Sequence, residues 1–163
     1  MRHFRVAMVA ACPFPASRGT PIRIYRSVEA LARRGHSIYV FTYHIGAPLN
    51  GEQFRIHRII RVPTCHRQAP EPTLQKLLIV DPLLMAKVTW SVRSSRYDIV
   101  LAHHYEGLLT SLPVKTLFRV PVMFDAHTLS GTELPSYSKG LAKRLMSATG
   151  RYLCSVSLEY QRR

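Results

Sequence analysis

The sequence has few acidic residues. Nine Asp and Glu stand against 23 Lys and Arg in 163 residues, which gives a formal net charge of +14. This excess suits partners that carry phosphate or carboxylate groups, such as phosphorylated small molecules, anionic lipid surfaces or nucleic acid. The cations are dispersed, however, and arginines adjoin only at 33–34 and 162–163. Dispersion favours a solvated basic face and disfavours a nucleic-acid stripe.

Cysteine is scarce, and long apolar runs are missing. Cys12, Cys65 and Cys154 are widely spaced and form no C-x-x-C, so neither a disulfide framework nor a cysteine zinc site is indicated. We therefore expect a reducing, cytoplasmic location. No stretch approaches the roughly 20 uncharged apolar residues that a membrane-spanning helix needs, so any membrane contact would be peripheral.

Several signature motifs are also absent. The sequence contains no G-x-G-x-x-G, no G-x-x-x-x-G-K-[ST] and no G-x-S-x-G, which argues against a P-loop and against a hydrolase nucleophile elbow. A metal site formed by His103, His104 and His127 is poorly supported, because adjacent histidines rarely bind one ion together and no carboxylate stands at ligand spacing. We therefore expect no bound metal and no cofactor.

What the sequence does have is an alternation of apolar strands and helices. Strands are expected at 5–11, 38–42, 54–62, 98–102, 121–125 and 152–157, and helices at 21–34, 74–92, 105–112 and 138–149. The polar segment 64–72 is expected to be a linker. Uninterrupted apolar strands are typical of a parallel sheet covered on both faces. The sequence therefore predicts one α/β domain with a doubly wound, mainly parallel, Rossmann-like sheet.

Two helices carry specific expectations. Thr20 is expected to cap the first helix, with Pro21 at its first position and Gly35 just past its end. Pro82 should kink or split the helix at 74–92. The dense apolar residues of that helix could form a membrane-contact face, but we favour an internal crossover helix whose apolar side chains lie in the core.

The turn after the first strand is the first candidate site. Ligands of doubly wound sheets bind beyond the carboxyl ends of the strands. Gly19 and Thr20 lead into a helix whose free N–H groups would suit an anion, and Arg18 and Arg23 add charge. An ordinary connecting turn is the competing interpretation.

The ends of the fourth and fifth strands give two more candidates. His103, His104 and Tyr105 follow one strand, and consecutive histidines point in different directions, so at most one can face a cleft squarely. His127 follows the other strand and could donate a hydrogen bond to a substrate hydroxyl or phosphate. Each histidine could equally be a structural residue that packs in the core or caps a helix.

Several segments together resemble family-4-like glycosyltransferases of the two-domain GT-B architecture. The opening carries most of the resemblance: RVAMVA at 5–10, PFP at 13–15, RGTPIR at 18–23, SVEALARRGH at 27–36 and IYVFT at 38–42. DIVLAH at 98–103, PVMFDAH at 121–127 and the strand at 152–157 follow in the order typical of the N-terminal domain of that family. The resemblance therefore covers nearly the whole chain.

The resemblance implies a function and roles for residues. Such enzymes transfer a sugar from a nucleotide-sugar donor with retention of configuration, generally without metal, and many act on a glycan or lipid-linked acceptor at a membrane. The loop around Gly19 would approach the donor phosphate, and His127 would contact the transferred sugar as the catalytic residue. The first loop and His103 or His104 would shape the acceptor site. Peripheral contact with the inner face of the membrane is then expected.

The sequence also departs from the family. Relatives continue into a second, donor-binding domain with an E-x7-E motif, which this sequence lacks, and the first loop has only Gly19 where many relatives have paired glycines. The sequence therefore predicts an acceptor-side domain, 1–163, that is a fragment or one chain of a split enzyme and is inactive alone. A non-catalytic anion- or RNA-binding module and an inactive remnant stay open as alternatives.

Overall fold

The computed structural model describes residues 2–17, 19–48, 54–63 and 76–126. Contacts divide the chain into two units, Met1–Asp125 and Ala126–Arg163. The first unit contains the sheet and the helices described below. The expected linker at 64–72, helix at 138–149 and strand at 152–157 lie outside the described residues.

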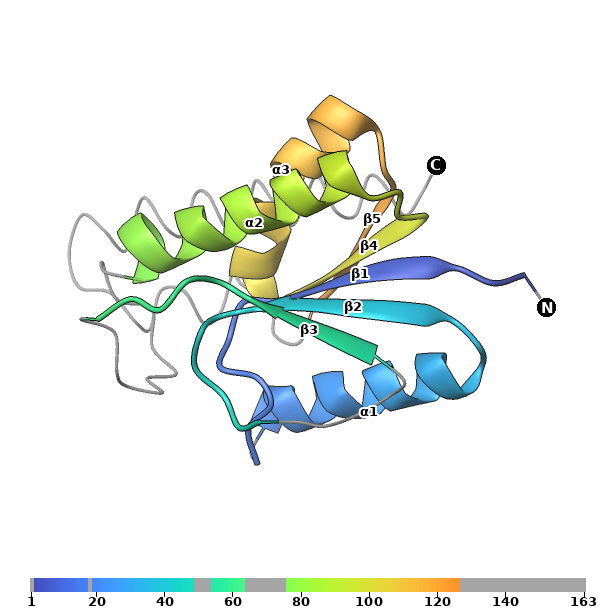
Figure 1. Ribbon diagram of the computed structural model, residues 1–163, viewed down its shortest axis with the longest axis horizontal. Helices are drawn as coiled ribbons and strands as arrows, with labels where there is room; N and C mark the ends of the chain where they lie inside the picture. The colour runs from blue at the N-terminus through green and yellow to red at the C-terminus, as the bar shows by residue number, and fades with distance from the viewer. Residues whose placement is uncertain (1, 18, 49–53, 64–75, 127–163) are drawn as a thin grey trace. The chain divides into compact units, whose positions relative to one another are not determined.

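Five parallel strands form the sheet, in the spatial order β3-β2-β1-β4-β5 (Figure 1). Their bounds are Arg5–Ala10 for β1, Ser37–Thr42 for β2, Phe54–Arg58 for β3, Ile99–His103 for β4 and Val122–Asp125 for β5. The predicted parallel α/β fold is confirmed. From β1 the chain adds β2 and β3 on one side, and it then crosses back over β1 to add β4 and β5 on the other side. The direction in which strands are added therefore reverses beside the central strand β1. A crevice for ligands is expected beyond the carboxyl ends at such a switch.

Helices cover both faces of the sheet (Figure 1). Helix α1, Gly19–Arg33, packs on one face, where its Ile24 joins Met8 of β1 in one core cluster. The short η1, Lys76–Val80, α2, Asp81–Ser94, and α3, His104–Phe118, lie on the other face, where Leu84 joins Val9. Successive side chains of a strand point to opposite faces, so β1 is buried from both sides.

The first helix begins earlier than the sequence predicts. It starts at Gly19, so Thr20 lies within the first turn and is not the cap that we expected. The helix thus begins two residues before the expected first position, Pro21, and Gly19 has a φ of 49°, a left-handed conformation that glycine adopts without strain. The end agrees with the prediction: Gly35 has a φ of 83°, and its N–H donates to the carbonyl of Ala32 at 2.9 Å.

The predicted helix at 74–92 is split, as expected, but its apolar side chains do not all lie in the core. Pro82 occupies the first turn of α2, where a missing N–H leaves no hydrogen bond unmade. Leu84 and Val88 are fully buried, whereas Leu78 is 68% and Trp90 70% exposed. The assignment of every apolar residue to the core was therefore wrong. Only one side of α2 can face the sheet, and the opposite side exposes Trp90 beside Lys87 and Arg93.

The helix after β4 is longer than predicted. We expected it to end at Leu112, but α3 continues through Pro113 to Phe118. A proline inside a helix removes one main-chain hydrogen bond and crowds the preceding turn. Val114 is fully buried in the core, and its packing keeps the helix going past the proline.

Candidate functional site at the carboxyl edge of the sheet

Strand register places three residues side by side at the carboxyl edge. Ala10 at the end of β1 pairs with His103 at the end of β4, and His103 pairs with Asp125 at the end of β5. The turns that leave these strands therefore start next to one another. The sequence predicted such a convergence for the first, fourth and fifth strands, and the register confirms it for the strand ends.

A carboxylate links two of the predicted site residues. Arg23, on the first turns of α1, donates from Nη2 to Oδ1 of Asp125 at 3.3 Å. The other oxygen of Asp125, Oδ2, lies 3.2 Å from Nδ1 of His103, whose side chain is fully buried. Arg23 is 60% exposed, so one end of this bridge faces solvent and the other lies inside the fold. A carboxylate on Nδ1 fixes the orientation and tautomer of the imidazole ring.

The two neighbouring histidines differ in burial. His103 is the last residue of β4 and is buried, whereas His104 is the first residue of α3 and is half-buried. His104 has a φ of 62°, a left-handed backbone conformation that is uncommon for a residue with a side chain. Tyr105 follows on α3 and is also half-buried.

The turn into α1 is open around its glycine. A Cβ added to Gly19 would have no heavy atom within 4 Å, so space for a ligand lies beside the N-terminus of the helix. Thr20 is half-buried next to it. Arg18 and His127 lie outside the described residues, and their roles stay predictions.

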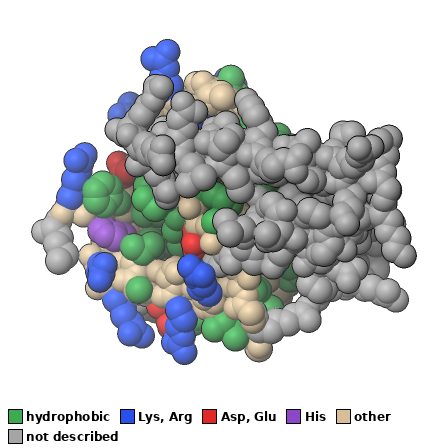
Figure 2. All heavy atoms as spheres, turned by 180° about the vertical axis from the view of Figure 1, so that it is seen from behind, with side chains coloured by type: hydrophobic (Ala, Val, Ile, Leu, Met, Phe, Trp, Pro, Cys, Tyr) green, Lys and Arg blue, Asp and Glu red, His purple; other side chains and the backbone are tan. Residues whose placement is uncertain are grey.

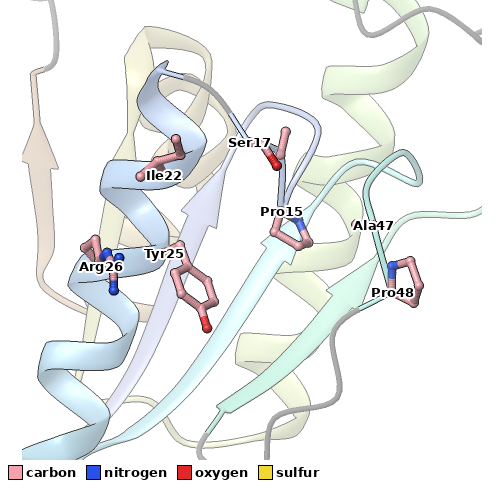
Figure 3. Close-up of a pocket in the computed structure, with 8 residues that line it drawn as sticks. Pro15, Ser17, Ile22, Tyr25, Arg26, Ala47 and Pro48 are labelled. Atoms are coloured by element: carbon pink, nitrogen blue, oxygen red, sulfur yellow. The ribbon is translucent and has the colours of Figure 1, made fainter.

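A hollow of about 450 Å³ lies beside this turn, between α1 and two loops (Figure 3). Ile22, Tyr25 and Arg26 of α1 form one wall, and Pro48 belongs to the loop on the opposite side. Pro15 lies between them on the loop after β1. The walls are mainly apolar, and the guanidinium of Arg26 supplies a cation, which also pairs with a glutamate of its own helix. Sequence reasoning missed this hollow, because its walls come from segments far apart in the chain.

Comparison with known proteins decides the family. The model for Glycosyltransferase Family 4 matches residues 17–157. The chain belongs to this family. Family membership confirms the resemblance, and the matched residues include the motifs at 18–23, 27–36 and 38–42. The edge described above is therefore the carboxyl edge of a glycosyltransferase-family domain. No curated protein matches the sequence closely enough to count as a relative.

Solved structures show the same fold. Sucrose-phosphate synthase from Thermosynechococcus elongatus superposes with a TM-score of 0.68 at 14% identity, over 90% of this chain and 40% of its own. The C-terminal domain of a hydrogenase from Pyrococcus furiosus gives a TM-score of 0.52 at 15% identity, over 77% of this chain and 94% of its own. Two such different proteins share the sheet, so this likeness describes architecture and not activity. The chain spans 40% of the length of the synthase.

The glycosyltransferase-family domain has a second cluster of polar side chains, formed by Tyr43, Lys76, Asp81 and Glu106. It lies on the opposite face of the sheet, around η1 and the start of α2. Lys76 donates from Nζ to Oε1 of Glu106 at 2.6 Å, and the side chains are only 16% and 21% exposed. Tyr43 donates from its hydroxyl to Oδ1 of Asp81 at 2.5 Å. These pairs join η1 to α3 and the end of β2 to α2, and they close this face of the edge.

The pKa values in this cluster follow from burial and neighbouring charge. Burial raises the pKa of Asp81, although the Tyr43 hydrogen bond and the Lys76 charge oppose the rise. Burial alone would also raise the pKa of Glu106, but the charge and hydrogen bond of Lys76, with smaller contributions, leave it below the ordinary value. Burial raises the pKa of Cys12 to about 12, so its thiol stays protonated at neutral pH.

Sequence reasoning did not single out this cluster. Glu106 lies in the segment with His103 and His104, so the local sequence offered a signal, but Tyr43, Lys76 and Asp81 come from other segments. Among the described residues, no group of three or more His, Cys, Asp or Glu could hold a metal ion. Within the same residues, no helix is both long and apolar enough to cross a membrane.

Proposed function

We propose that this chain is the acceptor-side domain of a retaining glycosyltransferase, which transfers a sugar from a nucleotide-sugar to a glycan or lipid-linked acceptor. One observation carries the proposal. In a domain of this family, an open turn at Gly19, the Arg23–Asp125–His103 bridge and a hollow lie together at the carboxyl edge of the sheet. This edge is where doubly wound sheets bind ligands.

The donor phosphate would lie at the N-terminus of α1. The helix begins at Gly19 with no side chain in the way, and the first N–H groups of a helix suit an anion. Arg18 would add charge, and Arg23 would add charge and carry the link to Asp125. His127 follows Asp125 by two residues, so the bridge holds the start of the segment that would bring His127 to the transferred sugar.

The acceptor would occupy the hollow beside α1. The ring of Tyr25 offers a flat face for the apolar side of a sugar, and Ile22 and Pro48 complete an apolar surface. Arg26 would meet an anionic group of the acceptor. His103, His104 and Tyr105 would shape the side of the site toward β4.

A second domain would supply recognition of the nucleotide. It would belong either to a longer form of this polypeptide or to a separate chain, and this domain by itself would be inactive. The retaining chemistry of such a pair would need no metal and no further cofactor.

The proposal is tested with the chain joined to, or mixed with, its donor-binding partner. A panel of UDP- and GDP-hexoses is assayed for transfer to glycan and polyprenyl-phosphate acceptors, and the anomeric configuration of the product is read by NMR. Tyr25→Ala should raise the acceptor KM about five- to thirtyfold with the donor KM unchanged, because it removes about 1–2 kcal/mol of ring contact. Arg34→Ala, at an exposed position past the end of α1, is the control. Inverted product, or an unchanged acceptor KM in Tyr25→Ala, would contradict the proposal.

We also propose that the outer side of η1 and α2 contacts the inner face of an anionic membrane, which places the protein in the cytoplasm. Leu77, Leu78 and Trp90 are 51%, 68% and 70% exposed, and Lys87 and Arg93 are exposed beside them. The only acid between residues 76 and 96 is Asp81, which is buried. Elsewhere on the molecule, Lys and Arg side chains also project into solvent around the described part (Figure 2). Apolar and cationic side chains together suit anionic lipid.

The single tryptophan of the chain, Trp90, reports on this contact directly. Its fluorescence should shift to the blue with vesicles of phosphatidylcholine and phosphatidylglycerol, and the shift should weaken with salt. Lys87→Glu combined with Arg93→Glu should abolish it, whereas Arg34→Glu should leave it in place. Emission that is the same with and without anionic vesicles would contradict membrane contact.

A further inference from the structure

The two loops that line the hollow are joined by one guanidinium. Arg58, the last residue of β3, donates from Nη1 to the carbonyl of Phe14 and from Nη2 to the carbonyl of Ala47, each at 2.8 Å. Phe14 precedes Pro15, and Ala47 precedes Pro48, so both loops belong to the side of the hollow that faces α1. The two nitrogens of one planar group therefore hold these two loops together as one side of the hollow.

The loops also bind each other directly. The N–H of Phe14 donates to the carbonyl of Ile45 at 3.2 Å, and the N–H of Ala47 donates to the carbonyl of Pro15 at 3.2 Å. Phe14 is fully buried in the core on the α1 side, which anchors its loop. We call this contact, in which Arg58 and the backbone hydrogen bonds connect the loops at 14–17 and 45–48, the joint. It is fixed to the core through Phe14 and to the edge strand β3 through Arg58.

A glycine is required where the loops meet. A Cβ on Gly46 would stand 2.1 Å from the carbonyl oxygen of Phe14 and 2.6 Å from Nη1 of Arg58. Both are far inside van der Waals contact, and the φ of 153° is itself unusual for a residue with a side chain. The backbone at Gly46 thus lies close to both the guanidinium of Arg58 and the backbone of the other loop.

We propose that Arg58 is a positioning residue that keeps the loop side of the acceptor hollow in place opposite α1 by holding the loops at 14–17 and 45–48 together. The proposal rests on the proposed function for the identity of the ligand, but not for the joint itself. Arginine suits this role because its fork presents two donors in a fixed plane. Lysine keeps the charge but is a point donor on a flexible stem, so Arg58→Lys should lose the bridge while retaining the cation.

Amide hydrogen exchange tests the joint without any ligand. The N–H groups of Phe14 and Ala47 are themselves bonded across it, so they report its opening. Arg58→Lys and Arg58→Gln should speed their exchange at least about tenfold, the change expected for losing at least one charge-assisted hydrogen bond. Arg55→Gln, at an exposed position on the same strand, should change it less than twofold. Exchange that is equally slow in Arg58→Gln and the wild type would overturn the proposal.

A second variant and a core reporter guard against general unfolding. Gly46→Ala should speed the exchange of the Phe14 and Ala47 amides as Arg58→Gln does, because the new Cβ separates the same loops. The amide of Met8, in the central strand, should stay protected in every variant. Equal loss of protection at Met8 and at Phe14 would mean that Arg58 stabilises the whole domain, which would also overturn the positioning role.

Kinetics with the donor-binding partner then separate the two proposals. Arg58→Lys should raise the acceptor KM about tenfold, with the donor KM within twofold of the wild type. If Tyr25→Ala raises the acceptor KM and Arg58→Lys does not, Arg58 has no positioning role, although the hollow binds the acceptor. If neither variant changes the acceptor KM while exchange at the joint rises, the acceptor binds elsewhere and the proposed function of the hollow fails.

Discussion

The two faces of the sheet use polar side chains differently at the same carboxyl edge. On the α1 face, Arg23 and Arg26 are 60% and 72% exposed, and Arg26 lines the hollow. On the α2 and α3 face, Lys76 and Glu106 are 16% and 21% exposed and pair with each other. Charges left in water are available to a ligand and contribute little to stability, whereas buried charges must be paired. One face is therefore suited to binding and the other to holding the fold together.

The largest effect should come from the core beneath the closed face. Leu84 of α2 is fully buried, so Leu84→Ala should lower the free energy of unfolding by about 2–5 kcal/mol through lost contacts and a cavity. Leu78→Ala, at an exposed position in η1, should change it by less than about 0.5 kcal/mol. Urea denaturation followed by circular dichroism measures both. Equal losses in the two variants would show that the outer side of η1 is buried in solution.

A smaller loss should follow from breaking the buried ion pair. Glu106→Gln should cost about 1.5–3 kcal/mol at pH 7, the usual range for a hydrogen bond to a charged group. The pKa of Glu106 is lowered in the folded protein, so its contribution is present above the unfolded value of 4.5 and is lost as the pH falls through the folded value. The difference in the free energy of unfolding between wild type and variant, measured by urea titration, should become smaller over that acid range. If this difference in free energy did not change with pH, the charge of Glu106 would not be its cause.

Asp81→Asn should act in the opposite direction. The pKa of Asp81 is raised, so the folded protein favours the neutral carboxyl and loses stability as the pH rises from 3.8 through the folded value. Asparagine is neutral at every pH and can still accept the Tyr43 hydrogen bond. At pH 7 the variant should be as stable as the wild type or more stable, by on the order of 1 kcal/mol or less. This advantage should vanish below pH 3.8, and a variant that is clearly less stable at pH 7 would contradict the account.

The smallest effect belongs to the open face. Glu29 pairs with Arg26 at 2.9 Å, but the arginine is 72% exposed, so Glu29→Gln should cost less than about 0.5 kcal/mol. The same substitution type thus tests both faces, Glu29→Gln on one and Glu106→Gln on the other. Thermal unfolding at low and high salt separates them, because only the exposed pair should respond to screening. Equal costs would remove the distinction between the faces.

Much of the fold could be predicted from local sequence, and much of the site could not. The five described strands and the split at Pro82 followed from apolar periodicity and proline positions, which act within a few residues. The early start of α1 depends on the left-handed Gly19, and the passage of α3 through Pro113 depends on the packing of Val114. Neither is visible in a local pattern.

For the site, the sequence predicted the edge but not the contacts. It pointed to Arg23 and His103, whose link through Asp125 requires the register of β4 and β5. It gave no sign of Arg58, which reaches Phe14 and Ala47 from another strand. Contacts between distant segments leave no periodic trace in one sequence.

The sequence by itself determined the order and type of the described elements, the parallel sheet and the family, because apolar repeats and turn residues act locally and motifs are read along one chain. Only the tertiary structure decided which charges are buried, which apolar side chains face solvent and which loops enclose the hollow. Those properties depend on which distant segments become neighbours on folding, because neighbouring groups determine the burial of a side chain and the electrostatic interactions of a charge.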